Sequence, residues 1–378
     1  MTTAAEARRN SPLWVRWLLP KDAPLFQRND AVVGWLMAAP ALIILTVFLV
    51  VPFLMAFTMS FTNQRLASPN PAEWVGLRNF ERLLNVQIFS LEPERDAAGH
   101  IVYDDGEIAY PRLRSFTRNN PDYPHLDGMR ELTSWQAGEN RTILLAADVV
   151  FFRALINTLI FAAVIAPLQG GLALLLALLL NQALPYISIF RSVYFAPVVV
   201  SMVVVSLLWR FIYDGQNGLL NTLLGIVTFG SFQPVDWLGN PYTALPAMIA
   251  MSAWQAVGFH MVIWLSGLQT IPTSLYEAAG LDGCGAWKKF RYVTWPGLRN
   301  TAVLVLIVIT IQAMGLFVQV DVMTRGGPLD ATQSVVYQAV QRGYAKQDIA
   351  EGSAISVILF VIVFVIAMAQ RYITRERN

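Results

Sequence analysis

Six long apolar stretches, joined by polar links, make up most of the chain. They fall near residues 32–60, 154–181, 187–212, 243–268, 301–323 and 353–371. Since a helix needs about 20 apolar residues to cross the hydrocarbon core of a bilayer, each stretch is long enough for one span. A seventh apolar run, 219–229, is too short to span and is expected at the outer surface of the bilayer. The pattern predicts an all-α integral membrane protein with six transmembrane helices.

Prolines interrupt the interiors of several predicted spans. They are Pro40, Pro52, Pro167, Pro197 and Pro246. In a protein anchored by a single transmembrane helix, a broken helix would be anomalous. A bundle that lines a path tolerates them, because neighbouring helices satisfy the freed backbone groups. The prolines therefore favour a bundle around a path.

Lysine and arginine are concentrated on one side of the predicted bundle. With the N-terminus inside, the inner segments hold 13 of these residues, and the short outer loops 213–242 and 324–352 hold three. The positive-inside rule then places both termini and the link 272–300 in the cytoplasm.

The polar links define the expected organisation of the chain. Leu13, Trp14, Trp17 and Leu18 share one helical face, so the first 30 residues are expected to form a cytoplasmic tail with an interfacial helix. The apolar run that follows is too long for a signal peptide, so this tail is expected to stay attached. The predicted parts are the tail 1–30, a first transmembrane helix 31–61, an extracytoplasmic loop 62–152, a five-helix transmembrane domain 153–372 with a cytoplasmic loop 272–300, and a cytoplasmic tail 373–378.

The first loop contains a polar insertion at 86–148, with 11 acidic and 6 basic residues. Two short β-like runs flank Asp105-Gly106, which predicts a β-hairpin with a two-residue turn. Asp104, Asp105 and Glu107 lack the spacing of a calcium loop, so a solvated turn is the better interpretation. We expect a small extracytoplasmic cap here that touches a solute-binding protein.

Composition excludes several other classes of protein. The chain is 55% hydrophobic and only 14% charged, as expected for a membrane protein, and a nucleic-acid partner is not expected. One Cys and three scattered His do not favour a disulfide framework or a metal site. No phosphate-binding Gly-x-x-x-x-Gly-Lys-Ser/Thr loop and no Ser/His/Asp arrangement occurs, so we predict a non-enzymatic subunit without a cofactor of its own.

The link 272–300 is the most polar and most basic part of the membrane-embedded half. Ser274 and Glu277 have the spacing of a capping box, which predicts that a helix begins there. Gly283 is expected to end that helix, and a second helical turn then leads to Pro296. The link is therefore expected to form two short helices at an angle on the membrane surface.

This link resembles the EAA loop of ABC-importer permeases. The matching positions are Glu277, Ala278, Ala279, Gly283, Val293 and Pro296, while Cys284, Trp295 and Asn300 depart from the common pattern. In that family the loop is the coupling helix that docks into a groove on a cytoplasmic ATPase subunit. The resemblance implies that Glu277, Ala278, Ala279, Gly283 and Pro296 couple this chain to an ATPase. An ordinary cytoplasmic connector is the alternative.

Other segments resemble carbohydrate-uptake permeases of the maltose and glycerol-phosphate type. They are the Gly-Leu-x-Asn-Phe segment at 76–80, the Asn-Thr pair at 157–158, the Gly-Leu-Leu-Asn segment at 218–221 and the Thr-Arg-Gly-Gly-Pro turn at 324–328. The pattern is most similar to the first, maltose-permease-F-like, of the two permeases. It implies the type I ABC-importer permease fold and binding-protein-dependent uptake of a sugar or oligosaccharide across a bacterial or archaeal inner membrane. It also implies a second homologous permease, two ATPase subunits that hold ATP-Mg, and an extracytoplasmic solute-binding protein as partners.

Polar side chains inside the spans are candidates for the substrate path, because they are costly in a bilayer and usually face a bundle or cavity. Aromatic faces, amides and carboxylates suit sugars, which favours Trp254, Gln255, Gln312, Gln319 and Asp321 as the path. A helix–helix hydrogen bond is the alternative for each, and it is preferred for Gln169 and His260. Near the outer ends of their spans, Arg210 can pair with Asp321 or extend toward the headgroups.

Three rival functions stay open on the sequence alone. An ion-coupled secondary transporter should carry a charged residue near mid-membrane, but Asp321 lies near the end of its span. A membrane-anchored structural or signalling protein needs neither the 272–300 loop nor broken spans. A permease for glycerol-3-phosphate should need more cations in the path than Arg210, although a second permease could supply them.

Overall fold

The computed structural model describes residues 25–104, 106–182 and 185–374. The predicted interfacial helix around Trp14 and Trp17 lies outside the described residues, as do the last four residues. The chain divides into two units, residues 1–58 and 59–378. Four helices are long and apolar enough to cross a membrane, or up to six when each of two bent helix pairs counts as one span.

The described part of the first unit is one long helical segment, which is nearly all apolar from residue 31 onward. It comprises α3 (Leu25–Leu45), the π-helical turn η1 (Thr46–Val50) and most of α4 (Val51–Met59). The Thr46 hydroxyl donates to the Leu42 carbonyl at 2.7 Å, so the one polar side chain of the π-turn is satisfied within the helix. This segment covers the first predicted span.

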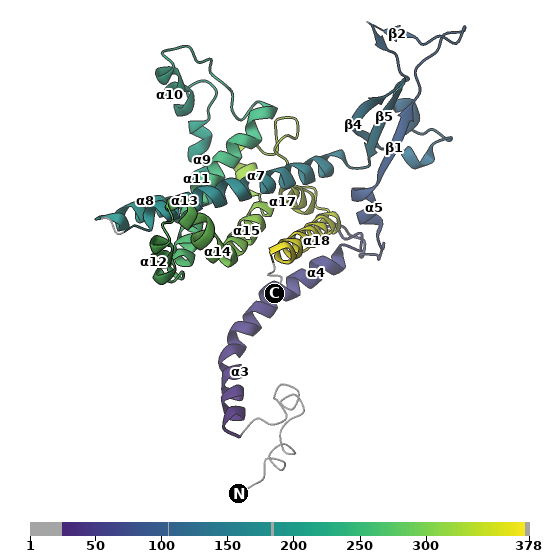
Figure 1. Ribbon diagram of the computed structural model, residues 1–378. Coiled ribbons are helices and arrows are strands. Elements are labelled where there is room, and N and C mark those ends of the chain that lie inside the picture. Colours follow the sequence, from purple (N-terminus) through teal and green to yellow (C-terminus); the bar gives the residue numbers. More distant parts are fainter. Residues whose placement is uncertain (1–24, 105, 183–184, 375–378) are drawn as a thin grey trace. The chain divides into compact units, whose positions relative to one another are not determined.

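The second unit contains a helical bundle built around α11. Its long helices are α7 (Val149–Leu180), α8 (Ile187–Val199), α9 (Met202–Ile212), α11 (Pro241–Gln269), α15 (Arg299–Met314) and α18 (Ile349–Thr374). Helix α11 packs against α7, α8 and α15, and α15 packs against α18 (Figure 1). Small and flexible residues are common in the buried core, which includes Ala173 and Ala177 of α7 and Met248 and Met251 of α11. Small residues let helix backbones approach closely inside a membrane bundle.

Two predicted spans are broken instead of straight. The span expected over 187–212 splits into α8 and α9, which meet at 96°. Val200 and Ser201 are extended there, and the helix ends at Val199, two residues after Pro197. The span expected over 301–323 stops at Met314 and resumes as α16 (Val318–Met323). The six-helix fold class stands. The break within 187–212 falls in a span that Pro197 marks as interrupted, whereas the break within 301–323 was not predicted.

The insertion between the first two spans is a folded β-domain. Strands β1 (Val86–Leu91), β4 (Arg130–Ala137) and β5 (Asn140–Ala146) form an antiparallel sheet in the order β1-β5-β4. The strands β2 (Tyr103–Asp104) and β3 (Glu107–Ile108) pair with two residues between them, as the sequence predicts. The sheet was not predicted. Its core consists of Leu91, Leu126, Met129, Ile143 and Leu145.

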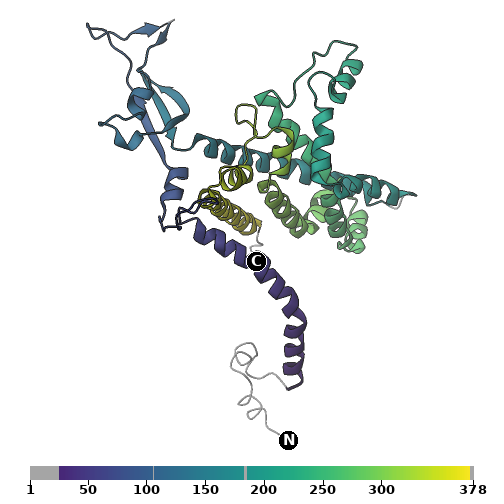
Figure 2. The ribbon, with the colours of Figure 1, turned by 180° about the vertical axis from the view of Figure 1, so that it is seen from behind.

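Short helices complete the second unit. They are α5 (Arg78–Leu84), α6 (Arg114–Thr117), η2 (Pro124–Leu126), α10 (Leu219–Val227), α12 (Thr273–Leu281), α13 (Ala286–Lys289), η3 (Phe290–Thr294), α14 (Trp295–Gly297), α17 (Val335–Val340) and η4 (Gln341–Ala345). In both views, α12 to α14 lie at the opposite end of the bundle from the β-domain (Figures 1 and 2).

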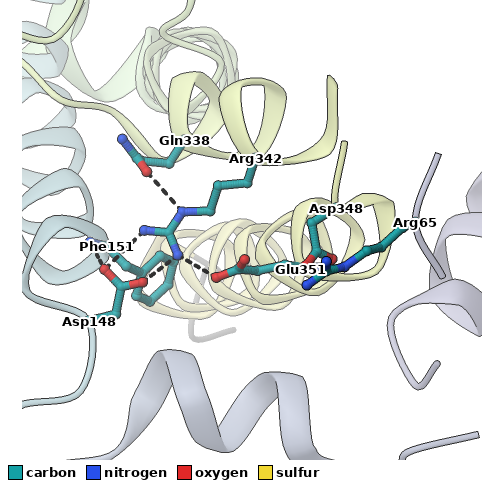
Figure 3. A network of polar contacts seen from close by, with 7 residues as sticks. All are labelled: Arg65, Asp148, Phe151, Gln338, Arg342, Asp348 and Glu351. Atoms are coloured by element: carbon teal, nitrogen blue, oxygen red, sulfur yellow. Dashed lines mark hydrogen bonds and ion pairs between the residues drawn. The ribbon is translucent and has the colours of Figure 1, made fainter. Parts of the chain in front are cut away.

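A buried ion cluster joins the β-domain to the helices (Figure 3). Asp148 caps α7 directly after β5, accepting from the Phe151 amide at 2.9 Å. Both of its oxygens also accept from Arg342, one of them at 2.9 Å. Arg342 donates to Glu351 at 2.6 Å and to Gln338 at 3.0 Å as well. The guanidinium therefore ties the start of α7 to η4, α17 and α18.

The environment of Asp148 favours its charged form. Burial alone would raise the pKa of this carboxyl, but the hydrogen bonds and positive charge of Arg342 outweigh burial and hold the pKa below its ordinary value. The start of the first loop, 62–152, is fixed nearby by backbone hydrogen bonds, from the Leu66 amide to the Gln347 carbonyl at 2.8 Å and from the Ala350 amide to the Gln64 carbonyl at 3.0 Å. The beginning and the end of this loop are thus both anchored beside the first turn of α18.

Candidate functional site

A cavity of about 380 Å³ lies among α7, the α8–α9 break, α11, α15 and α16. Its walls carry four glutamines, one serine and two phenylalanines among aliphatic residues, and none of the lining side chains is charged. The lining residues are Phe161, Ile165, Gln169, Val198, Met202, Ser252, Gln255, Ala256, Phe259, Ile309, Gln312, Ala313 and Gln319. The volume is in the range of small-molecule sites.

The four glutamines differ in how they are held. The Nε2 of Gln169 lies 2.8 Å from Nδ1 of His260, and the Nε2 of Gln255 lies 3.5 Å from the Pro197 carbonyl oxygen. The side-chain amides of Gln312 and Gln319 make no hydrogen bond with any residue that the structure describes. Two glutamines are therefore fixed in the wall, and two can bind a ligand without first breaking a hydrogen bond.

The cavity brings together three of the five predicted path residues: Gln255, Gln312 and Gln319. Trp254 does not line it, because successive helix residues point about 100° apart. Its half-exposed ring lines a separate apolar groove between α7, α8 and α11 and packs edge-on against Trp209.

Asp321 also lies outside this cavity. The two groups considered as an ion pair, Arg210 and Asp321, do not form one among the described residues. Arg210 instead donates to the backbone carbonyl of Val322 at 3.4 Å. Asn157, another polar span residue, donates to the carbonyl of Asp330 at 2.9 Å and so fixes a loop.

Sequence reasoning missed the cavity-lining roles of Ser252 and Phe259. A signal was present, because Ser252, Gln255, Ala256 and Phe259 are spaced three or four residues apart and so share one face of α11. Gln169 was expected to make a helix–helix hydrogen bond, and it does so with His260 while also facing the cavity.

The predicted coupling loop forms two short helices, as expected, but it begins differently. Helix α12 starts at Thr273 with Pro272 at its N-cap position and no side-chain cap, so the predicted capping box of Ser274 and Glu277 does not form. Ser274 is already inside the first turn, where its hydroxyl cannot act as the N-cap.

The end of α12 follows the glycine pattern. Gly283 adopts a φ of 70°, and the amide of Cys284 donates to the Ala279 carbonyl at 2.9 Å, which is a Schellman ending. The hydroxyls of Tyr276 and Thr294, 3.0 Å apart, link α12 to η3. These hydrogen bonds therefore fix the conformation of the turn between the two helices.

The loop presents a mixed apolar and charged surface. Glu277, Ala278, Gly283 and Pro296 are exposed, and Ala279 is half-buried. Large apolar side chains stand out from the same loop: Leu281 is 92% exposed and Trp287 is 74% exposed. Glu277 makes no ion pair within the part of the chain that the structure describes. Clustered exposed apolar groups around an unpaired charge are typical of a protein-binding surface.

Comparison with known proteins identifies relatives. The sequence profile of the family described as binding-protein-dependent transport system inner membrane component matches residues 171–377. The lactose transport system permease protein LacF of Rhizobium radiobacter is 34% identical over 64% of this chain and 82% of its own. The trehalose/maltose transport system permease protein MalF of Thermococcus litoralis is 33% identical over 60% of this chain and 76% of its own.

The same fold occurs in a solved structure. A chain from a bacterial ABC transporter involved in the import of the acidic polysaccharide alginate superposes with a TM-score of 0.65, at 18% identity, over 93% of this chain and 98% of that chain. The family match includes the coupling loop and three of the four cavity glutamines, and Gln169 lies two residues before it.

Proposed function

The chain belongs to the family of binding-protein-dependent transport system inner membrane components, and from that premise we propose that it is the permease subunit of an ABC importer for a sugar or oligosaccharide. It is a multi-pass protein of the inner membrane. Its relatives are named for lactose, trehalose/maltose and diacetylchitobiose uptake. The fold and the apolar helices agree with that role.

The uncharged, glutamine-lined cavity is the observation that carries the sugar assignment. An amide offers both donors and acceptors, and so does each hydroxyl of a sugar. The rings of Phe161 and Phe259 in the same wall can lie against the apolar faces of a pyranose. Gln312 and Gln319 supply amides that no described residue occupies.

The cavity weighs against the rival solutes. A phosphate ester calls for arginine or lysine, and an ion-coupled carrier calls for a charged group in the path. None of the cavity-lining residues is charged. A neutral solute therefore fits these walls better than glycerol-3-phosphate does.

The proposed partners follow from the 272–300 loop and from the lack of an ATP-binding motif in the sequence. Because the sequence has no phosphate-binding loop, ATP-Mg is held by two separate ATPase subunits, and a second homologous permease completes the path. The exposed surface around Glu277 docks on an ATPase subunit. The loop lies at the opposite end of the bundle from the β-domain (Figure 1), which supports a cytoplasmic loop and an extracytoplasmic β-domain that touches a solute-binding protein. Cytoplasmic termini are proposed from the distribution of Lys and Arg alone.

Coupling in this arrangement is mechanical. When ATP closes the ATPase pair, α12 to α14 move with it and shift the helices that they join, α11 and α15. Both helices line the cavity, so their movement opens it toward the binding protein, which delivers the sugar. No covalent intermediate forms on this chain.

A pull-down of the tagged chain from membranes tests the proposal. An ATPase and a second permease should co-purify, and Glu277→Lys should abolish sugar uptake while ATP hydrolysis continues or the ATPase is lost. Glu107→Lys, which reverses an exposed charge in the β-domain, is the matched control and should keep both partners. Recovery of the chain alone at normal transport activity would refute the importer assignment.

A further inference from the structure

We propose that His260 is a positioning residue for the cavity: it orients the side-chain amide of Gln169 so that this amide presents a fixed hydrogen-bonding group to the sugar. The inference rests on the proposed function, because it assumes that the cavity passes a sugar. His260 itself does not line the cavity.

The contacts of His260 all lead to the cavity wall. Its side chain is completely buried, and Nδ1 lies 2.8 Å from the Gln169 Nε2 and 2.9 Å from the Ala256 carbonyl oxygen. Its ring meets the ring of Phe259 edge-on, with centroids 5.2 Å apart and planes at 85°. Gln169, Ala256 and Phe259 all line the cavity. A single buried imidazole therefore supports three wall residues.

The contact with Gln169 decides which end of its amide faces the ligand. A glutamine amide has a donor end and an acceptor end. Here Nε2 of Gln169 lies against Nδ1, which accepts its N–H when the imidazole proton is on the other ring nitrogen; the 2.9 Å contact between Nδ1 and the Ala256 carbonyl is then not a hydrogen bond. The Gln169 carbonyl oxygen makes no hydrogen bond with any described residue. Gln169 thus offers an acceptor to a sugar hydroxyl. Without His260, the amide could turn and offer either end.

The other ring nitrogen supports a functional role. The Nε2 of His260 is buried and has no hydrogen-bond partner in the part of the chain that the structure describes. Buried polar atoms are usually satisfied, so an unpaired ring nitrogen is unfavourable for helix packing alone. Half of the hydrogen-bonding capacity of the imidazole is unused, and a role for Nδ1 in holding Gln169 accounts for an imidazole at this position.

Simple helix packing explains the contact less well. A second hydrogen bond already links α7 and α11: Trp264 Nε1 donates to the carbonyl of Gly170, the residue after Gln169, at 3.1 Å. Neither Trp264 nor Gly170 lines the cavity. Trp264→Phe therefore removes a hydrogen bond between the same two helices without touching the wall, and it serves as the matched control.

The test uses the complete transporter in proteoliposomes with its binding protein. Lactose, maltose and trehalose are the probes, and the readout is sugar imported per ATP hydrolysed at saturating sugar-loaded binding protein. A purely structural defect lowers import and hydrolysis together and leaves this ratio unchanged. Loss of one oriented hydrogen bond should lower the ratio about fivefold.

His260→Leu and Gln169→Leu should lower the ratio to the same extent, and the double variant should be no worse than Gln169→Leu, because His260 acts through Gln169. His260→Asn, whose amide can reach the position of Nδ1, should restore most of the ratio. Trp264→Phe should leave it unchanged. If His260→Leu does not assemble, His260→Met takes its place in the cycle.

Additive effects, an unchanged ratio in His260→Leu, or an equal loss in Trp264→Phe would overturn this inference alone. A wild-type transporter that imports none of the three sugars would overturn the sugar assignment and this inference with it.

Discussion

Replacing Arg342 by glutamine should destabilise the protein more than any surface substitution. The side chain of Arg342 is only 5% exposed, and its guanidinium neutralises two carboxylates, Asp148 and Glu351, which are 18% and 16% exposed. Arg342→Gln leaves both carboxylates buried without a cation. The side chain of Gln338 also loses its hydrogen bond to the Arg342 Nε.

The magnitude follows from what remains after the substitution. Removing one partner of a buried ion pair costs about 3–5 kcal/mol, because the uncompensated charge stays buried. The melting temperature of the purified transporter should then fall by roughly 10 °C. Arg65→Gln is the control: Arg65 is 67% exposed and lies 3.8 Å from Asp348, so its loss should cost at most about 1 kcal/mol.

Acidification should separate the charge effect from lost packing. In the wild type, the pKa of Asp148 is held below its ordinary value of 3.8. Its contribution to stability is therefore fully present above pH 3.8 and is lost only as the pH falls through the lowered, folded-state value. In Arg342→Gln, the hydrogen bonds and charge of Arg342 are gone, and burial raises the pKa of Asp148. Lowering the pH from 7 to 5 should then narrow the gap in melting temperature between the variant and the wild type.

Neutralising the whole cluster provides the refuting measurement. A triple variant with Asp148→Asn, Arg342→Gln and Glu351→Gln removes the unpaired charges and should recover most of the loss. A triple variant as unstable as Arg342→Gln at every pH would mean that shape, and not charge, decides stability here.

Three further predictions concern other parts of the second unit. Gly258→Ala should destabilise the α8–α11 contact, because the added Cβ would lie 2.1 Å from a backbone oxygen of α8, whereas Gly171→Ala meets nothing within 4 Å and should be neutral by melting temperature. Asn221→Asp should lower the free energy of unfolding by about 1–3 kcal/mol and the melting temperature with it. The Nδ2 of Asn221 contacts three backbone carbonyls that would lose their donor, while its oxygen could still accept from Trp237 at 2.8 Å. Deleting residues 90–147 should leave the two permeases assembled but abolish stimulation of ATP hydrolysis by the binding protein, and full stimulation would contradict the proposed role of the β-domain.

The sequence predicts the helices well because their signal is local. Apolar length alone indicates where most of the spans lie, and a two-residue turn indicates the β2–β3 hairpin. The three-stranded sheet has no such signal, since Val86 pairs with Ala146, 60 residues later, and residues this far apart leave no mark on local periodicity.

The helix breaks show a different limit. Pro167 and Pro246 lie within the continuous helices α7 and α11, whereas α8 ends two residues after Pro197. A proline therefore indicates that a break is tolerated without indicating where one occurs, because neighbouring helices decide whether the freed backbone groups are satisfied.

The candidate site likewise contains some residues that the sequence could predict and others that it could not. Residue chemistry was enough to select Gln255, Gln312 and Gln319, but it could not separate Gln255 from its neighbour Trp254. That distinction depends on which face of α11 meets α7 and α15, and only the packed bundle determines it. His260 was recognisable as a helix–helix contact, yet its position behind the cavity wall is a property of the fold.

The break between α8 and α9 lies in one wall of the cavity, because Val198 stands just before it and Met202 just after it. Helix α9 has 11 residues, which corresponds to a rigid arm of about 16 Å at 1.5 Å per residue, so a rotation of about 10° at Val200 and Ser201 would move its far end by about 3 Å. That far end is anchored in the bundle: Val205 and Tyr213 are part of the buried core, and the Tyr213 hydroxyl donates to the Ala247 carbonyl of α11 at 3.0 Å. Any change of aperture at this break must therefore be shared with α11 and the core, which couples the width of the cavity to the packing of the whole bundle.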